Sequence, residues 1–440
     1  MRPPVARDAG AFALLLISPV LSLLRITAVA AFVSIPDFAL YSASVAVGSF
    51  LSTLLSFGLI ERTIQLFPRL VHDGKADILA REALDIAGKL LLRAAVVTAG
   101  LVAAAVAFAP DQTLLAAITG GIALGVSWFA LLASIQRGFV NPQRLARGTF
   151  LRAAITAGLV SLAATGGVLY WVLIAEVGSM LLGCVLTWAV FFRHLRPAAR
   201  GVVAGAAAGS GLIVFAAQSS AAAPFYLDRA YVTSILPGFA AGQYAVLALG
   251  ILAGSLLVST VVQKTGPETI VLAHRGEIAL ARRHAWRWMS LTAACWSLAM
   301  GAAWVVVAAG WVPAAYARYG ITPAMLLPVW LIGLLLNSGK LEFLVLALDR
   351  EWRLLRAALL FLGAVLIGAA LIAWQGGTIM AVLWGLVAAR AVYFAALWHA
   401  SRPGAEAERR LDAGAVEALA AGPTDPAAPA SAAGPGERAG

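Results

Sequence analysis

The sequence predicts an all-α polytopic membrane protein with about twelve transmembrane helices. Hydrophobic residues make up 61% of the 440-residue chain and charged residues 12%, whereas a soluble protein carries about 25% charged residues. A chain this apolar cannot cover itself with polar surface in water, so its long apolar runs are expected to face lipid. Its basic residues also collect in alternate loops, as they do in proteins that cross a membrane many times.

A helix needs about 20 apolar residues to cross the hydrocarbon core of a bilayer. The first apolar run continues past Arg25 to about Ile35. This is too long for the core of a cleaved signal peptide, and it predicts a membrane helix instead. With this length as the guide, the expected spans are 11–35, 40–62, 89–109, 113–135, 149–166, 168–192, 209–235, 241–263, 286–309, 324–347, 356–374 and 379–400.

The loops between these spans form two sets with very different numbers of basic residues. One set contributes only Arg318. The opposite set carries Arg69, Lys75, Arg81, Arg137, Arg144, Arg147, Arg193, Arg196, Arg200, Lys264, Arg275, Arg282, Arg283, Arg350 and Arg353. Because Lys and Arg are retained on the cytoplasmic side, this asymmetry predicts a multi-pass bacterial inner-membrane protein with both termini in the cytoplasm.

The two halves of the chain resemble each other. One shift along the sequence places Pro36, Phe38 and Ala39 on Pro237, Phe239 and Ala240. Chance matching in so biased a composition is the alternative explanation. A repeat of six helices, an even number, predicts two parallel lobes, 1–200 and 201–400, with a substrate bound between them. The segment 401–440, rich in Ala, Gly, Pro and Glu, is expected to be a disordered cytoplasmic tail.

Several short stretches point to a family. They are the turn Ile35-Pro36-Asp37-Phe38, the stretch L-S-F-G-L-I-E-R at 55–62, the repeated turn L-P-G-F-A-A-G-Q-Y-A at 236–245, and Asp228-Arg229. Together they resemble the polysaccharide flippases of the MOP (multidrug/oligosaccharidyl-lipid/polysaccharide) superfamily. Ala39 departs from the pattern, because the family usually has Gly in the first turn.

This resemblance implies a cargo and partners. The cargo would be a polyprenyl-diphosphate-linked oligosaccharide, which the protein would flip across the inner membrane for O-antigen, capsule or exopolysaccharide synthesis. The partners would be this substrate, membrane lipids and the polysaccharide polymerase or ligase machinery.

Ionisable residues inside membrane spans are costly and therefore mark candidate sites. Arg25, Arg229 and Arg62 are the candidates for substrate binding, because a guanidinium matches phosphate oxygens. Pairing of Arg25 with Glu61 or Asp228 is the structural alternative. The candidates for ion coupling or helix pairing are Asp228, Glu61, Glu176, Lys340 and Glu342. Arg390 is expected to reach the cytoplasmic interface, and Trp311, Tyr316 and Tyr319 are expected to form an outer aromatic belt.

Several functions lack the residues that they need. The sequence has no Walker A motif and no His or Cys pattern for a metal. We therefore expect no enzyme activity, no cofactor and no bound metal, and the basic loops are assigned to lipid rather than to nucleic acid.

Three alternatives to the polysaccharide flippase stay open. The first is a cation-coupled exporter of the multidrug-and-toxin-extrusion type. The second, a membrane polysaccharide polymerase or ligase, would need a longer outer loop. The third, a peptidoglycan-precursor flippase, would need more spans.

Overall fold

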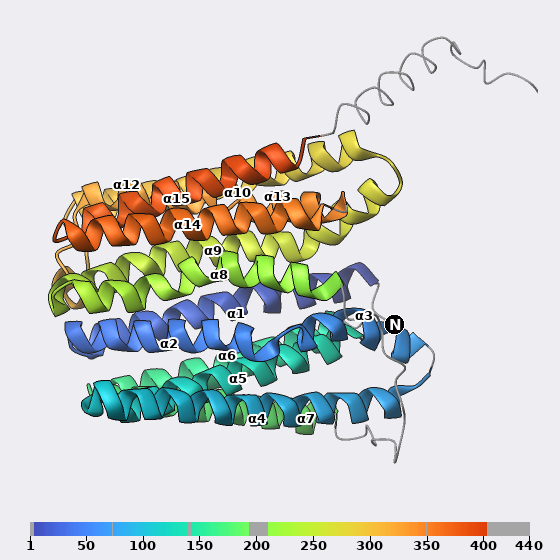
Figure 1. Ribbon diagram of the computed structural model, residues 1–440, viewed down its shortest axis with the longest axis horizontal. Coiled ribbons are helices and arrows are strands. Elements are labelled where there is room, and N and C mark those ends of the chain that lie inside the picture. The colour runs from blue at the N-terminus through green and yellow to red at the C-terminus, as the bar shows by residue number, and fades with distance from the viewer. Residues whose placement is uncertain (1–3, 73, 139–141, 193–209, 349, 403–440) are drawn as a thin grey trace, which may run out of the picture. The chain divides into compact units, whose positions relative to one another are not determined.

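The computed structural model describes residues 4–72, 74–138, 142–192, 210–348 and 350–402. Within these ranges the regular structure is helical, with no strand. Residues 1–400 form one compact unit, in which the long helices run nearly side by side (Figure 1). The predicted tail lies outside the described residues from 403 onward, and so does the predicted lobe boundary at 200.

The helices of the first half are α1 (Pro4–Phe32), α2 (Ile35–Ser56), α3 (Leu59–His72), α4 (Ala76–Phe108), the 3-10 turn η1 (Pro110–Gln112), α5 (Thr113–Gly138), α6 (Pro142–Ala164) and α7 (Leu169–Phe191). Those of the second half are α8 (Ser210–Ile235), α9 (Gly238–His274), α10 (Ile278–Ala308), α11 (Ala314–Ala317), α12 (Pro323–Leu335), α13 (Ser338–Ala347), α14 (Glu351–Trp374) and α15 (Ile379–Ala400).

Eleven segments in the described ranges are long and apolar enough to cross a membrane, with α12 and α13 taken as one segment. The helix expected at 209–235 forms as α8, which contains Asp228 and Arg229, but it is not among the eleven. It nevertheless packs against α2, α9 and α14. With α8 included, the described chain has the twelve long segments that the sequence predicts.

Two predicted spans are interrupted. The span 40–62 is wrong at its end, because α2 stops at Ser56 and Glu61 and Arg62 belong to α3. The break lies at Phe57 and Gly58, with φ of 31° and 75°, and this left-handed region suits glycine. The span 324–347 is likewise broken between α12 and α13. Hydropathy sums over a window and does not register a break of one or two residues.

Helix contacts in the two halves follow the same pattern. In the first half α6 packs against α1 and α7, and α5 packs against α2 and α7. In the second half α14 packs against α8 and α15, and α12 packs against α9 and α15. The turns into α4 and α10 also match, because each contains a left-handed glycine, Gly74 or Gly276. The six-helix repeat is therefore confirmed as a structural repeat.

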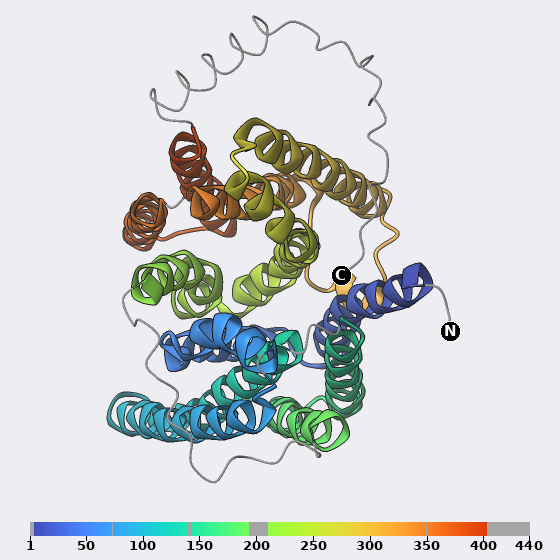
Figure 2. The ribbon, with the colours of Figure 1, turned by 90° about the vertical axis from the view of Figure 1, so that its right-hand side faces the viewer.

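The halves meet through α2, which packs against α8 and α9, and through α1, which packs against α9 and α11 (Figure 2). The approach is close where α9 begins. A Cβ atom on Gly242 would clash with Ile35 Cγ2, so no larger side chain fits there. Large apolar residues such as Leu92, Val96 and Ile367 are about two-thirds exposed, as expected of surfaces that face hydrocarbon.

Candidate functional site

The first half contains a buried charged cluster around Glu176 on α7. The Arg25 guanidinium on α1 donates from Nη1 to Glu176 Oε1. The Tyr41 hydroxyl on α2 donates to Glu176 Oε2 over 3.0 Å. Glu176 is fully buried and Arg25 is 9% exposed. Arg25 therefore pairs with an acid, as the structural alternative expected, but this acid is Glu176 on α7 and not Asp228 on α8.

Arg152 on α6 joins this region, although the sequence reasoning did not single it out. Its guanidinium carbon lies 3.4 Å from the centre of the Phe129 ring on α5, and Arg25 and Glu176 are among its electrostatic neighbours. The signal was present, because Arg152 is an ionisable residue inside the expected span 149–166. The Nε atoms of Arg25 and Arg152 are buried without a hydrogen-bond partner among the described residues.

A second charged cluster lies in the other half. Asp228 on α8 accepts a hydrogen bond of 2.5 Å from the Tyr244 hydroxyl on α9. The neighbouring Arg229 is 8% exposed, and its Nε is also buried without a partner among the described residues. Arg229 lies over the Phe225 ring at 6.0 Å. Asp228 and Arg229 thus lie together in a cluster of the second half, apart from the partners of Arg25.

Arg390 on α15 belongs to this second cluster, so the expectation that it reaches the interface is wrong. It is 8% exposed and lies 4.4 Å from the centre of the Phe361 ring on α14. Asp228 and Glu342 are among its electrostatic neighbours. Glu342 on α13 in turn accepts a 3.0 Å hydrogen bond from Tyr393 on α15. The interior position of α15 explains the error, because interfacial reach was inferred from the distance along the helix alone.

Lys340 forms a separate cluster with neutral partners. Its Nζ donates to Thr292 Oγ1 on α10 at 2.6 Å and to Asn337 Oδ1 at 2.8 Å. Lys340 and Glu342 therefore have different partners, as their spacing on one helix predicts. The side chains of Glu61 and Arg62 lie outside the described residues, so their predicted roles stay predictions. Among the described residues, no group of three His, Cys, Asp or Glu side chains could hold a metal ion.

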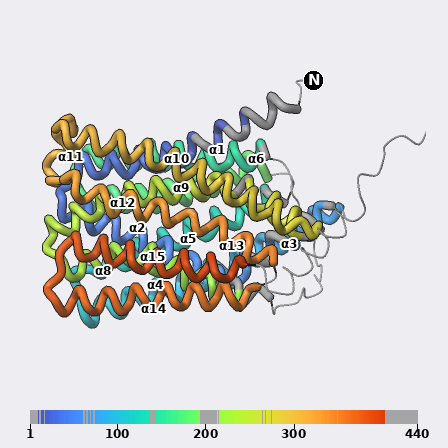
Figure 3. The backbone as a smooth tube through the Cα atoms, turned by 90° about the horizontal axis from the view of Figure 1, so that it is seen from above, coloured from blue at the N-terminus to red at the C-terminus, as the bar shows by residue number. Residues whose placement is uncertain are grey.

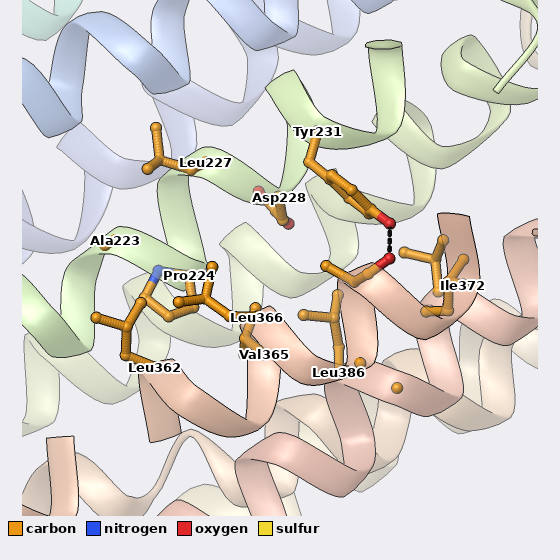
Figure 4. A pocket seen from close by; sticks show the side chains of 14 residues that line it. Ala223, Pro224, Leu227, Asp228, Tyr231, Leu362, Val365, Leu366, Ile372 and Leu386 are labelled. Carbon is orange, nitrogen blue, oxygen red and sulfur yellow. Dashed lines mark hydrogen bonds between the residues drawn. The ribbon is translucent and has the colours of Figure 1, made fainter. Parts of the chain in front are cut away.

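An apolar pocket of about 130 Å³ lies between α8, α14 and α15 (Figure 4). Leucine, isoleucine and valine side chains line most of it, and Asp228 and Tyr231 are its polar members. The Tyr231 hydroxyl donates to the Ala369 carbonyl across it. The space is close to that of a cavity of about 150 Å³ that binds benzene, so it accommodates a small apolar group beside the second charged cluster.

The segment around α11 fastens the two halves at one end of the helices, opposite the end where α3 lies (Figure 3). Tyr316 and Tyr319 donate to the Thr27 and Ala30 carbonyls of α1, each over 2.7 Å. Arg318 Nη2 donates to the Ala30 and Val33 carbonyls, each over 2.6 Å. We call these contacts the α11 clasp. Burial raises the pKa of Tyr319 above its usual value, so its hydroxyl stays a donor at neutral pH.

An aromatic belt was predicted from Trp311, Tyr316 and Tyr319, whose side chains would then be exposed. Trp311 is 72% exposed, as predicted, whereas Tyr319 is fully buried. Tyr316 and Tyr319 serve instead as donors to α1. Carbonyl groups in the last turn of a helix lack partners within their own helix, which explains why Tyr319 donates to Ala30. A sequence window gives no sign of this contact between distant segments.

Comparison with known proteins rests on structure alone. No protein-family model matches the chain, and no curated protein matches it either. Among solved structures, a MATE protein in complex with MaL6 has a TM-score of 0.58 and 12% identity over 92% of this chain and 96% of that one. The MATE multidrug transporter DinF-BH, solved as a complex, gives a TM-score of 0.57 and 14% identity, over 89% and 93% of the two chains.

A MOP superfamily transporter from Pyrococcus furiosus is also similar, with a TM-score of 0.56 and 12% identity over 93% of this chain and 95% of that one. The match spans both six-helix halves in all three structures. At this level of identity it defines the architecture and not the cargo. The chain therefore has the fold of the MATE transporters of the MOP superfamily.

Proposed function

We propose that this chain is an alternating-access transporter that flips an anionic lipid, of the polyprenyl-diphosphate-linked oligosaccharide class, across a bacterial inner membrane. One observation carries the choice of cargo. Five charged residues are buried in the described part of the chain, and four of them are basic: Arg25, Arg229, Lys340 and Arg390, against Glu176. An interior with an excess of positive charge favours an anionic ligand.

The arginines suit a diphosphate in particular. A guanidinium presents several N–H donors in one plane and can bind two oxygens of one phosphate group. The buried Nε groups of Arg25, Arg152 and Arg229 have no acceptor among the described residues. A diphosphate that enters between the halves would supply such acceptors once the Arg25–Glu176 pair separates.

Cation-coupled multidrug export is the second candidate, and the fold comparison by itself favours it. Three of the similar structures are described as multidrug or multidrug-resistance transporters of the MATE type. Carboxylates hydrogen-bonded to tyrosines, as at the buried Glu176 and the partly buried Asp228, would also suit a cationic drug or a coupling ion. Another similar protein is described by a reverse polarity of its binding pocket that suggests a different function, which supports the idea that this fold serves cargoes of either charge.

The deciding experiment expresses the chain in a strain that lacks its own polysaccharide flippase but carries the native glycan gene cluster. We expect restored surface polysaccharide, and no increase in drug resistance when the chain is expressed in a drug-sensitive host. Resistance to cationic drugs without restored polysaccharide would overturn the flippase proposal in favour of multidrug export.

Variants at Arg25 separate substrate binding from helix pairing. Arg25→Met alone leaves Glu176 unpaired, whereas Arg25→Met combined with Glu176→Leu removes both charges and avoids that defect. If the double variant reaches the membrane but restores no polysaccharide, Arg25 acts on the cargo. If the double variant is fully active, Arg25 only joins α1 to α7. Lys89→Met serves as the control, because Lys89 is half exposed and pairs only with Asp85 on its own helix.

A further inference from the structure

Lys340 is a buried amine whose partners are neutral. It is 4% exposed, and none of the ion pairs between described residues includes it. Its two hydrogen-bond acceptors are a threonine hydroxyl and an asparagine carbonyl. A permanently charged ammonium inside a membrane protein normally has a carboxylate beside it. The surroundings of Lys340 are those of a group that can also exist as a neutral amine, because burial favours the uncharged form.

The cluster can satisfy both protonation states. An ammonium donates to Thr292 Oγ1 and to Asn337 Oδ1, as the distances of 2.6 and 2.8 Å indicate. The Thr292 hydroxyl then donates its own hydrogen bond to Asn337 Oδ1, at 2.5 Å, or to the Trp288 carbonyl oxygen, at 2.7 Å. A neutral amine has a lone pair, and the same hydroxyl can rotate to donate to it. Loss of the proton therefore leaves the amine hydrogen-bonded, but it replaces charge-assisted hydrogen bonds to Thr292 and Asn337 with weaker neutral ones and so loosens the contact between α13 and α10.

The position of the cluster connects protonation to helix movement. Thr292 lies on α10, Asn337 lies in the break between α12 and α13, and Lys340 lies on α13. Interrupted helices commonly form the substrate and coupling-ion sites of transporters, between parts that move against each other. The N-terminus of α12, at Pro323, follows shortly after Tyr319 of the α11 clasp. Because Lys340 is buried, its proton can exchange with water only when α10 and α13 separate.

We propose that Lys340 binds and releases the proton that drives the transport cycle, and that its protonation state sets whether α13 stays bound to α10. This inference rests on the proposed transporter function but not on the identity of the cargo. It assigns the coupling step to an amine, whereas the buried acid Glu176 already pairs with Arg25.

Other titratable or charged groups lie on the helices that pack against α13, which are α9, α10, α14 and α15. On α13 itself Glu342 is bonded to Tyr393 of α15, and Arg390 of α15 is among the neighbours of Glu342. On α10 His284 pairs with Glu268 of α9. The remaining titratable or charged groups with described side chains are Tyr244 on α9, Arg282, Arg283, Arg287 and Cys295 on α10, Glu351, Arg353 and Arg356 on α14, and His399 on α15.

The first test observes the proton directly. The chain has only four lysines, Lys75, Lys89, Lys264 and Lys340. Biosynthetic labelling of lysine with ¹³C therefore gives four Cε signals in the purified full-length protein, and Lys340→Met identifies one of them. Because burial favours the neutral amine, we expect the Lys340 signal to shift below about pH 9, where a lysine in water stays charged. The control Lys89→Met leaves that shift unchanged.

The second test asks whether the proton controls a conformational change, without any cargo. A Cβ on Gly238 would lie 3.2 Å from Pro36 Cβ, near the separation of about 3.5–4.5 Å that a disulfide requires. The pair Pro36→Cys and Gly238→Cys, with Cys184→Ala and Cys295→Ala, therefore reports closure of the halves at the α11 end. Because the thiolate fraction of the cysteines also rises over this pH range, each rate of disulfide formation is divided by the rate at which the same cysteines react with a small disulfide reagent, and we call this ratio the cross-linking rate. In proteoliposomes we expect the cross-linking rate to change about tenfold between about pH 6 and about pH 9.

Two variants keep the proposal falsifiable if one of them folds poorly. Lys340→Met is always neutral and Lys340→Arg is always charged, so we expect each to make the cross-linking rate independent of pH, at opposite extremes. If the Lys340 signal does not move over this pH range, or if Lys340→Met keeps the pH dependence, the proposal is wrong. If the chain fails to restore polysaccharide but the Lys340 signal and the cross-linking behave as expected, the proposed cargo is wrong and the proposed proton site stands.

Discussion

At the scale of single residues, the buried pair Arg25–Glu176 contributes little net stability as a pair, but removing one partner is strongly destabilising. Two charges removed from water cost much of what their attraction returns, but one of them left alone costs far more. We therefore expect Glu176→Leu to destabilise the protein by about 3–5 kcal/mol, because it leaves Arg25 buried without a counter-charge. The double change Arg25→Met with Glu176→Leu should recover most of this loss. Thermal unfolding of the purified protein in detergent measures both.

Tyr41 supplies the matched control, because it contacts the same carboxylate without carrying charge. Tyr41→Phe removes one hydrogen bond and should cost only about 0.5–1.5 kcal/mol. A second outcome concerns the charged pair itself. If the combined variant Arg25→Met with Glu176→Leu loses as much stability as Arg25→Met and Glu176→Leu lose separately, added together, then Arg25 and Glu176 do not stabilise each other and the pair has no structural role.

The sequence predicted which residues are ionisable within spans, but not which of them meet. Arg25, Glu176, Asp228, Arg229, Lys340 and Glu342 were all selected because charge inside a span needs a reason. Their partners depend on the rotation and neighbours of each helix, which hydropathy does not specify. Arg152 was overlooked although the same rule applies to it, and Arg390 was misplaced because α15 presents it inward.

The α11 clasp acts at the scale of elements, because it attaches a short segment of the second half to the end of a long helix of the first. Arg318→Ala removes two hydrogen bonds from a charged donor, and because Arg318 is exposed, water offsets much of their free energy. We expect it to slow the cross-linking of Pro36→Cys with Gly238→Cys by about tenfold. Tyr319→Phe, which removes the hydrogen bond to Ala30 and a long one from Arg318, should have a smaller effect in the same direction.

Arg283→Ala is the control for the clasp, since this exposed arginine lies on α10 away from α11. It should leave the cross-linking rate unchanged. An unchanged rate in Arg318→Ala as well would mean that packing of α2 on α8 and α9 alone closes this end, and that the clasp only fixes the loop.

Element boundaries show where sequence reasoning succeeds and where it stops. The number and order of long helices followed from apolar runs of the length that crosses a bilayer. The polar ends of α4 and α10 were missed because a hydropathy window ends where charges begin, although Ala76 and Ile278 already lie in helix. The break after α2 depends on backbone torsion at Phe57 and Gly58, for which one Gly in an apolar run is a weak signal.

Orientation in the membrane belongs to the whole molecule, because it depends on the charges of all the loops together. The basic loops should stay in the cytoplasm, and the α11 end should face outward. In a background of Cys184→Ala and Cys295→Ala, we expect Gln375→Cys, in the exposed turn between α14 and α15, to react with a membrane-impermeant maleimide on intact cells. Glu277→Cys, in the exposed turn between α9 and α10, should react only after the membrane is opened. The reverse pattern would place the α11 clasp at the cytoplasmic face, so the closed end would be the entrance for a cargo made inside the cell, and the proposed direction of flipping would be wrong.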